Sequence, residues 1–373
     1  MATRSASPEG MVDEVTVGSH VSVRGRARSA SRRLALAALV FAGVAFGLSF
    51  HLGAERIWRA SEQRCFGVVN EMIRSGDWLT PRLDAEAAPR LHKPPLFYWA
   101  AAAAAKLAGG ATVVTLRSVS VLAGLGMAVV VFLWGRSLGG FACGIASTLS
   151  LAGTALFVVR SRYGDVEPLL ALTSVLALAS FERLWRTRDA RLLPVLAALV
   201  ALAFLTKATA ALLTIFAPIV VWLALHRSLH LALRPRVLAW AAASAAAGLA
   251  WYAAILVFVP GAFEQLVGLA LLPLGAPDPL RGAIHFRSAL FYLSRFPVQT
   301  LPASLLLPWL IADGVRTRFW RDDEQLRFVA AAFVTLFVAW SLVPQKQMHY
   351  LLPLTPLFAL LCGQRIARWL PRD

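Results

Sequence analysis

The chain has 373 residues, of which 58% are hydrophobic and only 15% are charged, and its formal net charge is +17. A soluble domain carries roughly 25% charged residues, so the composition excludes an ordinary soluble globular protein. The charge could suggest nucleic-acid binding, but the basic residues fall in short clusters between apolar runs, as the positive-inside rule expects. We therefore predict an integral membrane protein in contact with membrane lipids, with no nucleic-acid partner.

The N-terminal segment differs from the rest of the chain. Residues 1–33 are rich in Ser, Arg and Gly and show no apolar periodicity, so we expect a disordered, basic cytoplasmic tail. The apolar run that follows has no convincing small-residue cleavage site. It is therefore interpreted as a retained membrane span rather than a signal peptide.

Apolar runs predict about ten transmembrane helices, and thus an all-α polytopic protein with its membrane domain over 34–365. The expected spans are 34–53, 115–134, 141–159, 166–182, 192–206, 209–225, 237–258, 289–312, 328–343 and 349–364. The apolar piece 94–108 is short, and counting it as a span would place two Arg clusters on the wrong side. We expect a juxtamembrane helix there, both termini in the cytoplasm, and a short C-terminal tail over 366–373.

Residues 54–110 form the expected first outer loop. Within it, residues 62–74 have the apolar spacing of an amphipathic helix on the membrane surface. Four prolines then stiffen the return to the membrane: Pro81, Pro89, Pro94 and Pro95. Long ordered loops tend to be functional, so we predict that this is a catalytic loop.

A second polar segment, residues 160–168, separates the third and fourth expected spans. Asp165 and Glu167 lie there beside Arg160. They could form an interfacial salt-bridge cluster at a helix start. Alternatively, they could form a carboxylate site that faces Glu62, in which one acid deprotonates an acceptor and cations stabilise a departing phosphate.

The use of lysine also indicates an anion site. The chain has only four lysines among its 37 basic residues, and all four fall on the outer side of the expected topology. Lys106 is attributed to chance, whereas Lys93, Lys207 and Lys346 each lie at a junction between a loop and a span. A lysine ammonium is a compact point charge suited to phosphate. We therefore predict that these three side chains converge at one membrane face.

Taken in chain order, these motifs resemble the GT-C membrane glycosyltransferases. That group includes the aminoarabinose transferase acting on lipid A and, more distantly, the protein O-mannosyltransferases. The specific part is GDWLTPRL followed by KPPLFYW, over residues 76–99, and the resemblance covers residues 34–365. Weaker pieces follow in the same order: Arg117, Arg160 with Asp165, LTK at 205–207, Trp251-Tyr252, and Lys346 with His349-Tyr350.

The resemblance implies transfer of a sugar from a polyprenyl-phosphate donor to a lipid, glycan or protein acceptor. The reaction would occur on the outer face of a bacterial-type inner membrane. It also implies that Asp165 is the second-loop acid. The donor phosphate and its pocket would involve basic and aromatic residues, namely Lys93, Arg160, Lys207, Lys346, His349 and Tyr350.

Two positions depart from the family pattern. Ser61 stands where the family has a catalytic Asp, and His92 stands where an acid precedes the KPP motif. Glu62 could take over as the base, or His92 could do so, since its reference pKa of about 6.5 suits proton transfer. The third alternative is a catalytically impaired protein that binds lipid-phosphate sugars.

Other functional classes are less consistent with the sequence. A lipid or sugar transporter predicts charges within the spans and internal repeats, whereas these spans are almost free of charge and show no repeat. The chain has no P-loop and no Rossmann fingerprint, so a nucleotide-sugar donor is not expected. We predict no cofactor: Asp165 and Glu167 could hold a divalent metal, but two carboxylates alone do not establish a metal site.

Overall fold

The computed structural model describes residues 10–54, 60–91, 93–271, 290–318, 321, 323–343 and 346–369. These residues form helices and connecting loops, with no strand beyond an isolated bridge between Thr154 and Pro302. The predicted all-α class is therefore confirmed. By its internal contacts the chain divides into residues 1–44 and residues 45–373, which are described separately.

The first unit contains most of α1 (Gly10–Ser49). Residues 10–33 lie within this helix, and the disordered, basic tail expected over residues 1–33 stays a prediction. The apolar stretch Ala30–Ser49 is long enough to cross a membrane, and a helix propagates more readily than it nucleates.

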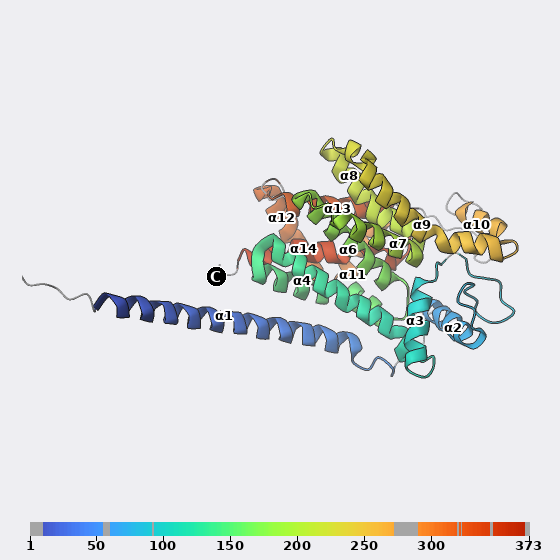
Figure 1. The fold of residues 1–373 in the computed structure, drawn as a ribbon, viewed down its shortest axis with the longest axis horizontal. Coiled ribbons are helices and arrows are strands. Elements are labelled where there is room, and N and C mark those ends of the chain that lie inside the picture. Colours follow the sequence, from blue (N-terminus) through green and yellow to red (C-terminus); the bar gives the residue numbers. More distant parts are fainter. Residues whose placement is uncertain are drawn as a thin grey trace, which may run out of the picture. The chain divides into compact units, whose positions relative to one another are not determined.

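The second unit is a succession of helices, shown in Figure 1. They are α2 (Ala60–Ser75), α3 (Leu96–Leu107), α4 (Val113–Ala152), α5 (Ala155–Arg162), α6 (Glu167–Thr187), α7 (Leu192–Ala211), η1 (Leu212–Phe216), α8 (Ala217–Leu225), η2 (Leu229–Leu233), α9 (Pro235–Phe258), α10 (Ala262–Leu271), α11 (Phe291–Gln299), η4 (Ala303–Leu306), α12 (Leu307–Thr317), α13 (Glu324–Leu342), η6 (Met348–Leu351) and α14 (Leu354–Ala367).

Six helical stretches among the described residues are long and apolar enough to cross a membrane. They are Ala30–Ser49, Val113–Ala152, Glu167–Thr187, Leu192–Leu225, Pro235–Phe258 and Glu324–Leu342. Two of them are interrupted: α4 by non-helical dihedrals at Gly139 and Gly140, and Leu192–Leu225 by those at Lys207. A straight helix of 40 residues would measure about 60 Å, twice the thickness of a bilayer core. Both breaks lie in the short gaps left between expected spans.

The short apolar segment 94–108 forms the helix α3. Its 12 residues rise only about 18 Å, which is too short to cross a bilayer. Phe97 and Tyr98 are buried against Val68 and Met72 of α2 and Leu116 of α4. Figure 1 shows α2 and α3 together at one end of α4, with α10 at the same end of the bundle.

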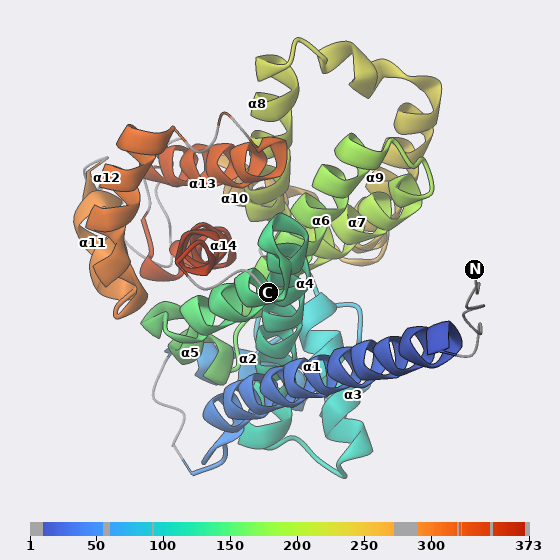
Figure 2. The same ribbon diagram turned by 90° about the vertical axis from the view of Figure 1, so that its left-hand side faces the viewer.

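The C-terminal helix α14 is almost entirely buried. Figure 2 shows it end-on, with α4, α12 and α13 around it. Its approach to α4 is closest at Gly363, where an added Cβ would lie 2.1 Å from Ser147 Oγ and 2.3 Å from Ser147 N. Only glycine fits at this helix crossing, because any other residue would overlap the backbone of α4.

Candidate active site

Two buried carboxylates form the centre of the candidate site. Asp165 lies in the turn between α5 and α6, and Glu167 is the first residue of α6. Each is only 3% exposed. The α6 helix begins here because Pro168 occupies a first-turn position, where its missing N–H costs no helical hydrogen bond.

Asp165 is held by two cations. Arg160 Nη2 donates to Oδ2 at 2.7 Å, and Lys93 Nζ lies 3.8 Å from Oδ1. Oδ1 also accepts from the Val166 amide at 2.8 Å. Burial alone would raise the pKa of Asp165, but the charges of Lys93 and Arg160 outweigh burial and hold this pKa well below its usual range. The carboxylate is therefore ionised at neutral pH.

Glu167 is held by residues from two distant parts of the chain. Lys207 Nζ donates to Oε1 at 2.7 Å, and His349 Nε2 lies 3.3 Å from the same oxygen. The Lys207 ammonium also lies 4.6 Å from the centroid of the Tyr350 ring, a cation–π distance. The break in α7 at Lys207 therefore coincides with the contact to α6.

These contacts define one group of ionisable residues, which we call the ion-paired cluster. It comprises Lys93, Arg160, Asp165, Glu167, Lys207 and His349. Burial lowers the pKa of His349 to about 4, so its imidazole is neutral at pH 7. Five of the predicted site residues are brought together in it, and Tyr350 stacks on its edge. Lys346 lies three residues before His349, is buried, and donates to the Val343 carbonyl at 2.7 Å. The predicted roles of these side chains remain predictions.

Glu62 is fully buried and lies beside the cluster. Arg117 Nε and Nη2 donate to its two oxygens at 2.7 and 3.0 Å, and the Gly164 amide donates to Oε1 at 2.8 Å. An added Cβ on Gly164 would lie 2.4 Å from Leu116 Cγ, so the loop backbone approaches α4 closely here. Glu62 therefore fastens α2 to α4 and to the residue that precedes Asp165. His92 lies outside the described residues.

Two pairings in this arrangement were not predicted from the sequence, although both residues of each pair had been named. Glu167 pairs with Lys207, and Arg117 pairs with Glu62, across 40 and 55 residues of chain. The available signal was the unusual placement of both residues at the start of apolar runs. No group of three or more His, Cys, Asp or Glu side chains with the geometry of a metal site is found among the described residues.

Comparison with known proteins agrees with this architecture. The chain matches the family model for dolichyl-phosphate-mannose-protein mannosyltransferase over residues 92–258. It is 26% identical over 359 residues to undecaprenyl phosphate-alpha-4-amino-4-deoxy-L-arabinose arabinosyl transferase 1 of Pseudomonas fluorescens (strain Pf0-1). That alignment covers 92% of this chain and 59% of the relative.

Two solved structures share the fold. ArnT from Cupriavidus metallidurans, bound to undecaprenyl phosphate, superposes with a TM-score of 0.74 at 20% identity, covering 90% of this chain and 60% of that one. The oligosaccharyltransferase AglB from Archaeoglobus fulgidus, with an inhibitory peptide and a dolichol-phosphate, gives a TM-score of 0.59 at 12% identity, covering 88% and 50%.

The fold is therefore that of the GT-C membrane glycosyltransferases. The chain is similar in sequence and in fold to the aminoarabinose transferases of this group, so the resemblance predicted from the motifs is confirmed. The chain spans about three fifths of the length of these relatives.

Proposed function

We propose that the chain transfers a sugar from a polyprenyl-phosphate donor to a lipid, glycan or protein acceptor. The reaction takes place on the outer face of the inner membrane, with both termini in the cytoplasm. The convergence of Lys93, Arg160, Lys207 and His349 on two buried acids carries this proposal. An apolar bundle that gathers cations at one end suits a lipid with a phosphate headgroup.

In the proposed reaction the acceptor oxygen forms a bond to the anomeric carbon. The bond from that carbon to the phosphate oxygen breaks, and the phosphate leaves with the electron pair. Lys93 and Lys207 lie where they can share their charge between the carboxylates and this phosphate. The acceptor gives its proton to a base in the same step.

Three side chains are candidates for the base that accepts this proton: Asp165, Glu62 and His92. Asp165 has a strongly lowered pKa, so it binds a proton weakly and suits positioning of cations better than proton abstraction. Glu62 already accepts three hydrogen bonds, which favours a positioning role for it. The alternative assignments to Glu62 and to His92 remain predictions.

A second candidate function is donor binding without transfer. It is favoured by the engagement of Glu62 with Arg117 and Gly164, together with Ser61 at the position of the expected acid. Such a protein would keep the cation-rich site and lack an available base.

The test uses the full chain in lipid nanodiscs with a panel of radiolabelled polyprenyl-phosphate sugars. Donor binding and donor consumption are measured for the wild type, Lys93→Ala and Lys106→Ala. Lys106 is a matched control because its ammonium lies over the Trp78 ring, 4.8 Å from the centroid, and pairs with no acid of the cluster. Loss of a charge-assisted contact should weaken donor affinity about tenfold or more in Lys93→Ala alone.

The outcomes separate the two candidates. Donor binding with consumption, sensitive to Lys93 and insensitive to Lys106, supports the transferase. Donor binding without consumption, with membrane extract supplied as acceptor, supports the binding function. Absence of donor binding across the panel would exclude both.

A further inference from the structure

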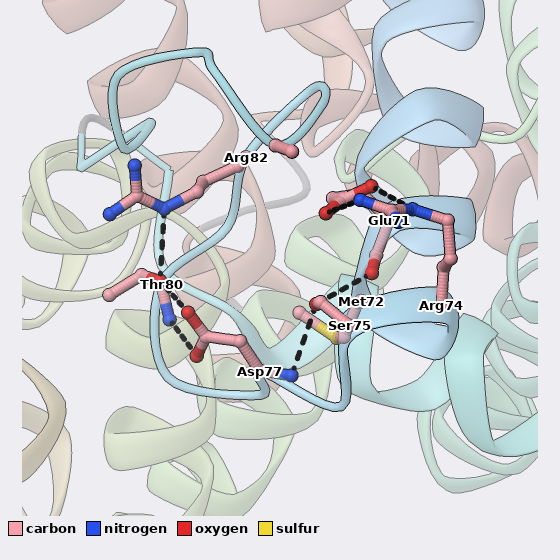
Figure 3. A pocket seen from close by; sticks show the side chains of 8 residues that line it. Glu71, Met72, Arg74, Ser75, Asp77, Thr80 and Arg82 are labelled. Carbon is pink, nitrogen blue, oxygen red and sulfur yellow. Dashed lines mark hydrogen bonds and ion pairs between the residues drawn. The ribbon is translucent and has the colours of Figure 1, made fainter.

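A second polar feature lies in the first outer loop, outside the ion-paired cluster. It is a pocket of about 250 Å³ between the C-terminal half of α2 and the loop that follows. Figure 3 shows the side chains around it, with the Glu71–Arg74 pair on one side and Asp77, Thr80 and Arg82 on the other. The lining residues are Glu71, Met72, Arg74, Ser75, Asp77, Thr80, Arg82 and Ala85.

The α2 side of the pocket is a preformed hydrogen-bonding surface. Arg74 Nε and Nη2 donate to the two oxygens of Glu71, each at 2.8 Å. Ser75 Oγ donates to the Glu71 carbonyl at 2.7 Å and accepts from the Asp77 amide at 3.2 Å. The Arg74 side chain is 61% exposed, so further N–H groups face the solvent side of the pocket.

The loop side is equally constrained. Asp77 Oδ1 accepts from the Leu79 and Thr80 amides at 2.9 and 3.0 Å, and the Thr80 hydroxyl donates to the same carboxylate. Burial would raise the pKa of Asp77, but these hydrogen bonds outweigh it and lower that pKa. Arg82 donates through Nη1 to Ala87 O at 3.0 Å. The wall is thus held in place before any ligand binds, which lowers the entropic cost of binding.

The charge of this pocket differs from that of the ion-paired cluster. Its two guanidinium groups, Arg74 and Arg82, are balanced by two carboxylates, Glu71 and Asp77. A pocket without net charge offers little to a phosphate. Carboxylates that accept, guanidinium groups that donate, and hydroxyls that do both are instead complementary to a ligand with several neighbouring hydroxyl groups.

The size and position of the pocket limit further which ligands it could bind. Pockets for whole ligands measure roughly 300–1,000 Å³, so this one suits a single unit of a larger molecule. Glu71 follows Glu62 by nine residues on α2, a rise of about 14 Å. Because Glu62 lies beside the ion-paired cluster, a molecule that occupies the pocket and also reaches the cluster would span a comparable distance.

We propose that this pocket binds one uncharged sugar unit of a glycan acceptor, while a hydroxyl of the same glycan lies at the ion-paired cluster. The inference rests on the proposed transferase function and assigns its acceptor class. A peptide acceptor is disfavoured, because six of the eight lining side chains are charged or carry a hydroxyl group, whereas peptide subsites are largely apolar.

The test blocks the pocket without removing any hydrogen bond of its wall. Ala85 lines the pocket and is exposed, so Ala85→Trp should fill it. Ala88 is exposed in the same loop but does not line the pocket, so Ala88→Trp is the matched control. Calorimetry in nanodiscs measures the binding of neutral hexasaccharides (gluco-, manno- and N-acetylglucosamine types), a sulfated hexasaccharide, inorganic phosphate and a serine- and threonine-rich peptide pool.

We expect at least one neutral hexasaccharide to bind the wild type and the Ala88→Trp variant equally. Ala85→Trp should weaken this binding about tenfold or more, because it displaces hydrogen bonds to charged groups. Donor affinity should be equal in all three proteins. Failure of every neutral hexasaccharide, equal binding by both variants, or preferential binding of phosphate, sulfated sugar or peptide would overturn the proposal. A failed transferase proposal gives a different result, namely loss of donor consumption with glycan binding intact.

Discussion

Lys207 donates to Glu167 at 2.7 Å from the point where its own helix is interrupted, with φ −165° and ψ 85°. A buried carboxylate is costly unless it is paired, and the nearest ammonium comes from a helix that must bend to supply it. The interruption of α7 is therefore part of the site rather than an irregularity beside it.

The Lys207–Glu167 pair can be tested by its effect on stability. Lys207→Met leaves the Glu167 carboxylate with His349 alone, and breaking a buried pair by removing one partner costs about 3–5 kcal/mol. We expect a clear fall in Tm, measured in nanodiscs. The double variant Lys207→Met/Glu167→Gln should recover much of this loss, because no uncompensated charge remains. Equal Tm values for the single and double variants would contradict the pairing.

Asp165 predicts a particular dependence of stability on pH. Its folded-state pKa lies below the unfolded value of about 3.9. Its contribution to stability is therefore complete above that pH and is lost as the pH falls toward the folded pKa. Thermal unfolding between about pH 2 and pH 7 should show a shallower acid limb, below about pH 4, for Asp165→Asn than for wild type. The exposed residue Glu86 supplies the control, since Glu86→Gln should leave the acid limb unchanged.

Glu62 offers a test of positioning against proton transfer. If Glu62 acts by positioning, Glu62→Gln disturbs the bidentate contact to Arg117, and both Tm and donor affinity fall together with turnover. If Glu62 is the base, turnover falls while donor affinity and Tm are nearly unchanged. The contacts to Arg117 and Gly164 lead us to expect the first result, with a stability loss of about 3 kcal/mol.

Ser61 offers the complementary gain-of-function test. It is the second residue of α2 and is half-buried, and an acid in the first turn of a helix is favourable. Ser61→Asp should therefore fold and supply the missing carboxylate, raising donor turnover about a hundredfold, within the range of general-base catalysis. Ser61→Asn is the uncharged control of matched shape. An equal effect of both substitutions would exclude a role for the added negative charge.

The sequence predicted which charged residues belong to this site better than it predicted which of them form ion pairs. Lys93, Asp165 and Lys207 were recognisable because charges are scarce in an apolar chain, and each stands beside a span. The contact of His349 with Glu167 joins residues 182 positions apart. Such contacts depend on helix packing, which local periodicity does not encode. The same limit applies to Glu62, whose partner Arg117 lies at the start of another helix.

The sequence likewise predicted some features of the fold and not others. Apolar runs located the six span-length helical stretches, and the break at Gly139 and Gly140 fell between two expected spans. The expected span 289–312 is instead divided among α11, η4 and α12. The tail expected over residues 1–33 stays a prediction, because composition alone does not say how far a helix continues from its apolar neighbour. Lys207 was expected at a junction between a loop and a span, but it lies within a composite helical stretch.

The contact of Gly363 with Ser147 influences the positions of His349 and Tyr350, although Gly363 touches neither of them. Helix α14 begins three residues after η6, so the distance at which α14 rests on α4 fixes how far His349 and Tyr350 reach toward α6. A single methyl group at Gly363 would displace the helix axis and, with it, the aromatic edge of the cluster. Variation at the crossing of α14 and α4 would therefore alter the proposed sugar transfer while every charged residue stayed in place.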